Sequence, residues 1–415
     1  RFQWPSARMA DTAKVRSLSV LMSTNASRLC GTLGSVSHEI SSDYRLSTLP
    51  EDRRPLCILG LGLIGGSLMR DAQAAGWPVF GWNRSEKTVT RARRDGYDVS
   101  GDLEATLRRA EEADALLILG VPMPALSSLL DAISQHAPTC GFTDVTSVKQ
   151  EVHDLVEAKG MSDRFVGGHP MAGTANSGWQ ATMHGLFKGA VWVVTYDNAR
   201  ELAGAGDGSV AGAEGGSVAG ADGGSVADAG GVAGADSADA VNRRWLDTWV
   251  RVVGLAEEVG AAVIPAIAHR HDNAVGRVSH LPHILAEALA VAGDYGGPLA
   301  LSLAASSFRD GTRVAGTDPD LVRAMVENNR PAVLDALDQT IELLQGARAD
   351  LANPDRSLKT LAEEGNAARG RFEARAGRNK GDASNRPIIR VRPGAPGWLD
   401  QLRSAESMGA QIGIF

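Results

Sequence analysis

Apolar residues between positions 55 and 195 gather in short runs, and segments with helical spacing separate these runs. The runs "PLCILG", "WPVFGW", "ADALLILGVP", "GFTDV" and "AVWVVT" have the length of buried strands, and "ALSSLLDAISQH" has the apolar spacing of a helix. Strands that alternate with helices are typical of a mostly parallel sheet with helices on both faces. We therefore predict an α/β fold of the Rossmann type, a doubly wound parallel sheet, over residues 55–266.

The pattern changes after residue 266, where long segments repeat their apolar residues at helical spacing. We predict an all-helical domain over residues 267–376 and expect it to hold two copies of the chain together as a homodimer. Residues 377–387 have the composition of a polar linker. Residues 388–415 then read as strand, helix and strand, which is too short to fold alone, so we expect this tail to dock on the body or on a partner subunit.

Two segments lack the pattern of a packed core. Residues 1–54 carry Arg, Ser and Thr without clear periodicity, and we expect a disordered arm or sequence upstream of a later start, with an organelle transit sequence as the alternative. Residues 203–240 use only Ala, Gly, Asp, Glu, Ser and Val, and "GSVAGAE", "GSVAGAD" and "GSVADAG" recur within them. We expect a disordered insert there, because this composition offers too little apolar surface to offset the chain entropy.

Charge and cysteine usage narrow the class of protein. The 415 residues carry a formal net charge of −7, whereas broad nucleic-acid binding needs clustered Lys and Arg, so we expect no nucleic-acid partner. No apolar run approaches the ~20 residues of a membrane-spanning helix, so we expect no membrane partner. Cys30, Cys57 and Cys140 have no paired spacing, which suits a reducing compartment, and we expect the protein in the cytoplasm. The histidine spacing does not fit a zinc site, so we expect no metal.

A glycine-rich turn follows the first apolar run. "GLGLIGGS" has the G-x-G-x-x-G pattern after a strand and at the start of a helix. Glycines at such a turn let the backbone approach a pyrophosphate at a helix amino end, where free N–H groups favour anions. We predict that a dinucleotide contacts this turn and the ends of neighbouring strands. The predicted residues are Gly60, Leu61, Gly62, Leu63, Ile64, Gly65, Val121 and Thr146.

The end of the second predicted strand bears on the choice of dinucleotide. An NAD site usually has an acidic residue about 20 residues after the glycines, where it binds the ribose 2′-hydroxyl. This chain has Asn83, Arg84 and Ser85 there, so no acid would repel a 2′-phosphate, and Arg84 and Ser85 can bind one. We predict NADP as the preferred cofactor, with NAD as the alternative.

Four polar clusters interrupt the apolar texture: "TDVTSVK", "FVGGHPMAGTANSGW", "HDNAVGRVSHLPH" and "SSFRDGTRVAGTDP". In the second cluster His169 lies between two glycines and a proline, which are residues with low propensity for helix and strand. The flanking glycines let the backbone lie close to a cofactor. A neutral imidazole with a pKa near its ordinary value of about 6.5 suits removal of a hydroxyl proton at neutral pH. We therefore predict His169 as a general base.

These clusters and the glycine turn, in this order and spacing, resemble the prephenate/arogenate dehydrogenase family over roughly residues 56–350. The resemblance implies a nucleotide domain joined to a helical dimerisation domain, and oxidative decarboxylation of prephenate or arogenate with hydride transfer to NAD(P) in tyrosine biosynthesis. By the same resemblance, Ser147 hydrogen-bonds and orients the catalytic His169, and Arg313 holds a substrate carboxylate. The other residues that it implies at the substrate are Ser279 and His283, on one helix face, Asp310 near the pocket mouth, and Thr174.

Several alternatives stay open. Many relatives have "HPMAGTE" where this chain has Ala175 after Thr174, and the missing carboxylate bears on the choice between prephenate and arogenate. Other candidate functions are a related NADP-dependent 3-hydroxyacid-type dehydrogenase and a non-catalytic NADP-binding regulator. His271, His280 and His153 are more typical of structural or surface histidines, and the pair at 271–272 would cap a helix or tie the domain junction.

Overall fold

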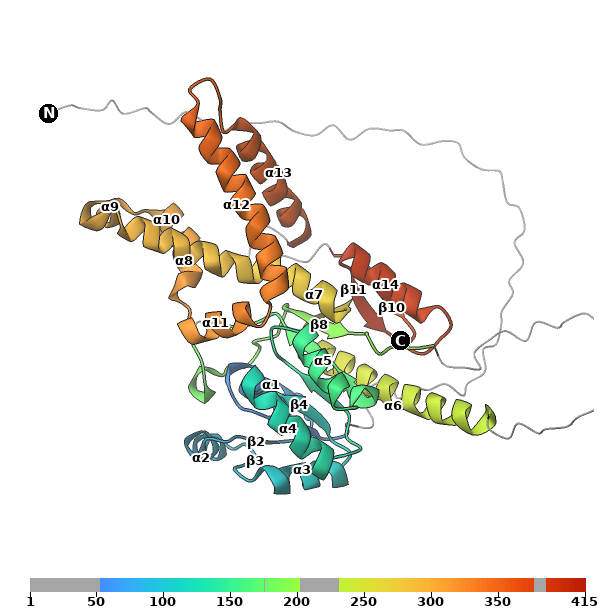
Figure 1. Cartoon of the computed structure of the whole chain (residues 1–415). Coiled ribbons are helices and arrows are strands. Elements are labelled where there is room, and N and C mark those ends of the chain that lie inside the picture. Colours follow the sequence, from blue (N-terminus) through green and yellow to red (C-terminus); the bar gives the residue numbers. More distant parts are fainter. Residues whose placement is uncertain (1–52, 175, 202–230, 377–385) are drawn as a thin grey trace, which may run out of the picture. The chain divides into compact units, whose positions relative to one another are not determined.

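A computed structural model describes residues 53–174, 176–201, 231–376 and 386–415, which belong to one compact unit, Ser47–Phe415 (Figure 1). The predicted arm over 1–54 lies almost wholly outside the described residues. So do Ala175, most of the predicted insert and most of the predicted linker.

Six parallel strands form the main sheet in the order β3-β2-β1-β4-β5-β6. They are β1 (Leu56–Leu59), β2 (Val79–Trp82), β3 (Val99–Ser100), β4 (Leu116–Leu119), β5 (Phe142–Asp144) and β6 (Phe165–Val166). The helices between them are α1 (Leu63–Ala74), α2 (Glu86–Arg94), α3 (Leu103–Glu112), α4 (Met123–His136) and α5 (Gln150–Ala158). This arrangement confirms the predicted Rossmann-type sheet.

Strand β1 shows why the apolar runs are continuous. Its four residues are completely buried, and successive side chains enter different cores: Leu56 and Ile58 pack in one, Cys57 and Leu59 in the other. Successive side chains of a strand point to opposite faces, so a sheet with helices on both faces needs apolar residues at every position.

A second sheet contains β7 (Gly168–Pro170), β8 (Val191–Thr195) and β9 (Ala262–Ala266). β7 runs antiparallel to β8, and β8 runs parallel to β9. His169 therefore lies in a strand, opposite Val193, whereas we expected its stretch to avoid regular structure. The glycine and proline neighbours of His169 have low strand propensity, but pairing with β8 overrides local preference.

Helix α6 (Gly231–Glu258) begins inside the segment over which we expected no structure. Its later turns bury Trp245 and Trp249 in the core. The preceding "GVAGADSADA" is rich in alanine, the best helix former, and a helix already formed by packing extends at little cost. The predicted insert therefore ends earlier than residue 240.

The helical part follows β9. It consists of α7 (Ala268–Val275), a π-turn η3 (Gly276–His280), α8 (Leu281–Asp294), α9 (Gly297–Leu303), α10 (Ser306–Thr312), a 3-10 turn η4 (Arg313–Gly316), α11 (Pro319–Glu327), α12 (Arg330–Ala352) and α13 (Lys359–Ala376). In the described ranges no single helix is long and apolar enough to cross a membrane. One pair bent by 120°, Ala268–Asp294 with Gly297–Leu303, reaches the length and composition only when its parts are combined.

The tail forms β10 (Ile388–Val391), α14 (Trp398–Met408) and β11 (Gln411–Ile414), with the two strands parallel. It docks on the body through α14. The Trp398 ring, 1% exposed, packs edge-on against Trp249 with 5.5 Å between ring centroids. The indole N–H of Trp398 donates to the Arg200 carbonyl at 3.3 Å.

Candidate active site

The turn between β1 and α1 can be built only with glycine. Gly60 has a φ of +106°, and a Cβ atom there would lie 2.5 Å from the carbonyl oxygen of Gly120. A Cβ atom at Gly65 would collide with the Gly60 carbonyl oxygen. At Gly62, the N-cap of α1, the space is open, no side chain caps the helix, and no acid lies in its first turn. The amino end of α1 is therefore open to an anion such as a pyrophosphate.

The side chain of Asn83 supports this turn, because its Oδ1 accepts the N–H of Leu61 at 2.9 Å. The next two residues remain available to a ligand. Arg84 and Ser85 are exposed, and Ser85 makes no side-chain capping bond to α2. None of the ion pairs within the described ranges involves Arg84.

A groove of about 630 Å³ lies along α2, and its lining starts at Glu86, the residue after Ser85 in the chain. Its wall on α2 contains the Glu86 carboxylate and three basic side chains, and the segment 177–180 lines the rest. The basic residues are Lys87, Arg91 and Arg94. The basic side chains outnumber the acidic one, so the α2 wall of the groove is net positive.

The other two predicted cofactor residues differ in their surroundings. Val121 is partly exposed and lies beside the Gly60 turn, 3.0 Å from the position of a Cβ atom there. Thr146 is already engaged by protein groups: its hydroxyl bonds to the Asp144 carboxylate and donates to the Val148 carbonyl at 2.9 Å. Lys149 Nζ lies 3.1 Å from the same hydroxyl.

Two histidines and an aspartate form a hydrogen-bonded series. His169 Nδ1 lies 2.8 Å from His271 Nε2, and His271 Nδ1 lies 2.8 Å from Asp272 Oδ1. A carboxylate only accepts, so His271 must carry its proton on Nδ1 and accept at Nε2. His169 must then donate from Nδ1, which leaves its Nε2 as a bare acceptor. The series thus fixes the tautomer that a general base needs.

The ionisation of the series fits this tautomer. Burial raises the pKa of Asp272, but hydrogen bonds from His271, Gln150 and Lys149 outweigh it and hold that pKa below its usual value. Burial, the neighbouring His271, and then Lys149 and His280 hold the pKa of His169 well below 6.5. Burial also lowers the pKa of His271, against the opposing effect of Asp272. The carboxylate is therefore charged and both imidazoles are neutral at neutral pH.

Asp272 also joins the helical part to the Rossmann part. Its Oδ1 accepts the backbone N–H of Lys149 at 2.8 Å, and its Oδ2 accepts that of Gln150 at 2.9 Å, so it caps α5. Its own carbonyl accepts a hydrogen bond from Asn329 at 2.8 Å. The pair at 271–272 thus ties the junction, and in addition His271 contacts the predicted base, a role that the sequence reasoning missed.

A buried ion pair holds β7 in place. The Lys149 side chain is 1% exposed and that of Asp144 is completely buried, and the two are in direct contact. Asp144 also accepts the N–H of Gly168, next to His169, at 3.2 Å. A Cβ atom at Gly168 would lie 2.7 Å from the Asp144 carbonyl oxygen, so only glycine fits. The position of His169 therefore depends on this pair.

Ser147 is partly exposed on the segment after β5. No hydrogen bond found among the described residues joins Ser147 to His169, whose Nδ1 is bonded to His271 instead. The orienting role that we expect of Ser147 stays a prediction.

Three of the predicted substrate residues lie on or beside α8. Burial lowers the pKa of His283, with Glu287 opposing. His283 lies close to the backbone of Val314, which raises its pKa, and to Arg313 on η4, whose charge lowers it. Ser279, in the π-turn before α8, contacts the Met325 sulfur at 3.9 Å.

Arg313 is exposed, and no ion pair in the part of the chain that the structure describes involves it. Thr174 and Asp310 are also exposed. Thr174 exchanges hydrogen bonds with the backbone of Asn176 at 3.2 and 3.4 Å. For Thr174 and Asp310, the structure provides no contact with the histidine series.

His280 is completely buried. Besides burial, its pKa is affected by Asp272 and His271 of the histidine series and also by His283. Its Nδ1 is 3.1 Å from the side-chain nitrogen of Asn329, whereas its Nε2 has no partner among the described residues. Burial lowers the pKa of His280 to about 4. Because Nδ1 accepts from Asn329, Nε2 carries the proton and is a buried donor.

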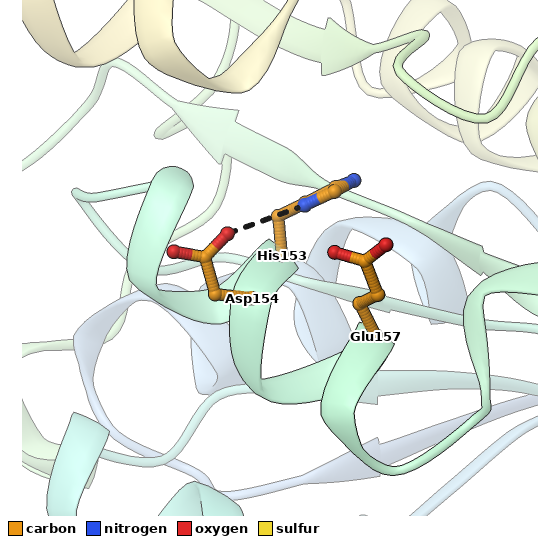
Figure 2. A group of neighbouring side chains, drawn as sticks. All are labelled: His153, Asp154 and Glu157. Carbon is orange, nitrogen blue, oxygen red and sulfur yellow. Dashed lines mark ion pairs between the residues drawn. The ribbon is translucent and has the colours of Figure 1, made fainter.

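A separate group on α5 could hold a metal ion by its residue types (Figure 2). Ligand atoms of His153, Asp154 and Glu157 lie within 4.8 Å of one another. His153 Nδ1 is 3.6 Å from Asp154 Oδ1, and Gln150 donates to the same oxygen at 2.7 Å. These side chains contribute nothing to the histidine series.

An open glycine turn on a Rossmann-type sheet and a neutral imidazole with a fixed tautomer define the class of nicotinamide-dependent dehydrogenases. Two family models match the chain. "Prephenate dehydrogenase, nucleotide-binding domain" covers residues 68–203, and "Prephenate dehydrogenase, dimerization domain" covers residues 267–363.

Individual relatives agree with the family models. A solved structure from Corynebacterium glutamicum, provisionally named as a prephenate dehydrogenase, is 49% identical, with a TM-score of 0.74 over 87% of this chain and 99% of that one. A prephenate dehydrogenase from Lactococcus lactis is 28% identical over 78% of this chain and 79% of its own. A Synechocystis arogenate dehydrogenase structure is 26% identical, with a TM-score of 0.52, over 77% and 99%. The chain belongs to the prephenate dehydrogenase family.

Proposed function

We propose that the protein oxidatively decarboxylates prephenate or arogenate in tyrosine biosynthesis, with hydride transfer to NADP or NAD. The observation that carries the proposal is the series of Asp272, His271 and His169, which leaves His169 Nε2 free to accept a proton. The alternatives of a 3-hydroxyacid-type dehydrogenase and a non-catalytic regulator have no such support, since the chain belongs to a different family and keeps a complete base.

The chemistry divides between cofactor and protein. A nicotinamide held at the glycine turn of Gly60 and Gly62 would supply the hydride acceptor for the ring carbon that bears the substrate hydroxyl. His169 Nε2 removes the hydroxyl proton, and Asp272, through His271, stabilises the imidazolium that forms. Loss of carbon dioxide then makes the ring aromatic, so the protein needs only to orient the substrate and remove the proton.

Substrate binding follows from charge. Prephenate carries two carboxylates, and Arg313 is an exposed guanidinium close to His283 and free of ion pairs in the described ranges. A guanidinium binds a carboxylate through two parallel hydrogen bonds. We assign one substrate carboxylate to Arg313 and polar groups of the substrate to Ser279 and His283.

NADP is the cofactor that we favour. Asn83 uses its side-chain oxygen to support the glycine turn, and Arg84 and Ser85 are exposed at the end of β2. Lys87 and Arg91 line the adjoining groove. A 2′-phosphate at the end of β2 would meet the Arg84 guanidinium and the Ser85 hydroxyl, where NAD sites typically have a carboxylate.

We also propose a homodimer formed by the helical domain. Among the described residues of 53–266, only Met183 and Val241 are large exposed apolar side chains. Helices α8 to α13 expose many more: Leu289, Val291, Tyr295, Leu299, Leu301, Leu303, Leu321, Leu334, Ile341, Leu343, Leu344, Leu351, Leu361 and Phe372. Apolar surface on this scale is typical of an interface, and the matching family model is named for dimerisation.

The experiment is to mix the pure protein with prephenate and with arogenate, each with NADP and with NAD, and to follow reduction of the nicotinamide. We expect turnover with at least one substrate, a higher kcat/KM with NADP, and 4-hydroxyphenylpyruvate or tyrosine as the product. The ratio of kcat/KM values for the two substrates assigns the specificity. Absence of turnover in all four mixtures would refute the proposal.

A further inference from the structure

The amino end of α7, the helix that carries His271 and Asp272, is capped by acidic side chains from two distant segments. The N-cap residue Ile267 has no capping side chain of its own. Its N–H donates to Glu406 Oε1 of α14 at 2.9 Å. The N–H of Ala268 donates to both carboxylate oxygens of Asp197 at 2.9 and 3.1 Å. Two of the free N–H groups of the helix are thus satisfied by tertiary contacts.

Glu406 is held firmly in this position. Its side chain is 9% exposed, and its Oε2 accepts the Tyr196 hydroxyl at 2.7 Å and Arg270 at 3.0 Å. The helix α14 that bears it is anchored by Trp398 and Leu402, which are 1% and 0% exposed. The carboxylate therefore links β8, α7 and the tail at a single point.

The capped end lies one helical turn from the histidine series. The N–H of His271 donates to the Ile267 carbonyl at 3.0 Å, so the residue that Glu406 holds also holds the backbone of His271. A shift of Ile267 would move His271. The hydrogen bond between His271 Nε2 and His169 Nδ1, now 2.8 Å long, would then lengthen or bend and weaken.

We propose that Glu406, in the C-terminal tail, is a positioning residue of the dehydrogenase reaction: by capping α7 it sets the place of His271 and thereby the orientation of His169. The inference rests on the proposed function. It gives the tail a part in catalysis although no hydrogen bond found in the described ranges joins α14 directly to the histidine series.

Loss of the cap has a distinct kinetic signature. If His271 shifts, His169 loses its orienting partner and gains access to water. Turnover then falls, because small misplacements of a catalytic group cost about 10- to 100-fold in rate. Reduced burial also lets the pKa of His169 rise toward 6.5, which moves the acidic limb of the kcat/KM profile to higher pH. A purely structural role would lower the melting temperature without moving that limb.

The test compares Glu406→Ala with Asp400→Ala in the full-length protein. Asp400 lies on the same helix with a side chain that is 78% exposed. Glu406→Gln can keep an oxygen acceptor for Ile267 but loses the ion pair with Arg270, so its kcat should lie between those of the wild type and Glu406→Ala. Glu406→Asp withdraws the acceptor by one methylene and replaces the alanine variant if that variant fails to fold.

We expect Glu406→Ala, or Glu406→Asp in its place, to lose about 10-fold or more in kcat, with an acidic limb at higher pH and an unchanged KM for the cofactor. The Asp400→Ala variant should match the wild type. A folded Glu406→Ala or Glu406→Asp variant whose kcat and pH profile equal those of Asp400→Ala would overturn the inference. Inactivity of the wild-type protein with both substrates would instead refute the proposed function, so the two failures are distinguishable.

Discussion

At the scale of single residues, the fixed tautomer of His169 explains how a partly buried imidazole can serve as a base. Its Nδ1 proton is committed to His271, and its Nε2 can only accept. The arrangement has the logic of a catalytic triad, in which a carboxylate orients an imidazole and stabilises its charged form. Here a second imidazole stands between the carboxylate and the base.

The lowered pKa of His169 predicts the pH dependence of the reaction. Burial and the neighbouring His271 hold that pKa well below 6.5, and the base works only when neutral. Activity is therefore present above the lowered pKa and is lost as the pH falls through it. We expect kcat/KM to stay constant down through pH 6.5 and to decline only at lower pH. An acidic limb centred at or above pH 6.5 would contradict this account.

Asp272→Asn should invert the tautomers. An asparagine amide that still caps α5 with its oxygen presents its NH₂ group to His271, which must then accept at Nδ1 and donate from Nε2. His169 would accept at Nδ1 and carry its proton on Nε2, where it cannot act as a base. We expect kcat to fall by about 100-fold or more, as in triads that lose their carboxylate. Kinetics together with circular dichroism test this, and a folded variant with near-normal turnover would show that the series is not used.

The sequence predicts some site residues better than others. His169 is predictable because glycines and a proline frame it and its cluster is distinctive. His271 is not, because its contact with His169 spans 102 residues along the chain and depends on the pairing of β7 with β8. The adjacent residues His271 and Asp272 were the available signal in the sequence. From them we predicted only a helix cap or a link between the two domains, and not a contact with His169.

At the scale of elements, we expect the turn from β2 to α2 to set the preference for NADP over NAD. We expect Arg84→Asp to raise the KM for NADP by about 10- to 100-fold, the worth of a lost charge-assisted hydrogen bond. The KM for NAD should change much less, because NAD has no 2′-phosphate. Steady-state kinetics with both cofactors provide the measurement, with Arg108→Asp on the exposed face of α3 as the control. Equal effects on the two cofactors would exclude a phosphate contact.

The elements with a strong apolar pattern were predictable, and those formed by context were not. β1 and β4 follow directly from their continuous apolar runs, because burial on both faces requires apolar residues at every position. Helix α4 follows from its helical spacing, because burial on one face leaves a clear period. Strand β7 exists because β8 and the Asp144 carboxylate hold "GHP" extended. Helix α6 extends into a low-complexity segment because its packed turns provide the nucleus.

At the scale of the whole molecule, the exposed apolar surface of the helical domain predicts the assembly. We expect light scattering to give twice the mass of the 43.4 kDa chain at micromolar concentration. Leu344→Glu, at a side chain that is 57% exposed, should shift the protein toward the monomer, since a buried charge destabilises an apolar interface. Arg323→Glu, at an exposed site of α11, serves as the charge control. A wild-type protein with the mass of one chain would contradict the predicted dimer.

The central claim is that this protein couples hydride transfer to loss of carbon dioxide with His169 as the base. The most direct measurement is the stoichiometry of carbon dioxide and reduced nicotinamide for the wild type, His169→Asn and the exposed control His184→Asn. We predict one carbon dioxide per reduced cofactor for the wild type and the control. For His169→Asn we predict a rate lower by about 10²- to 10⁴-fold with cofactor binding retained. Near-normal turnover in His169→Asn, or reduction of the cofactor without release of carbon dioxide, would contradict the account.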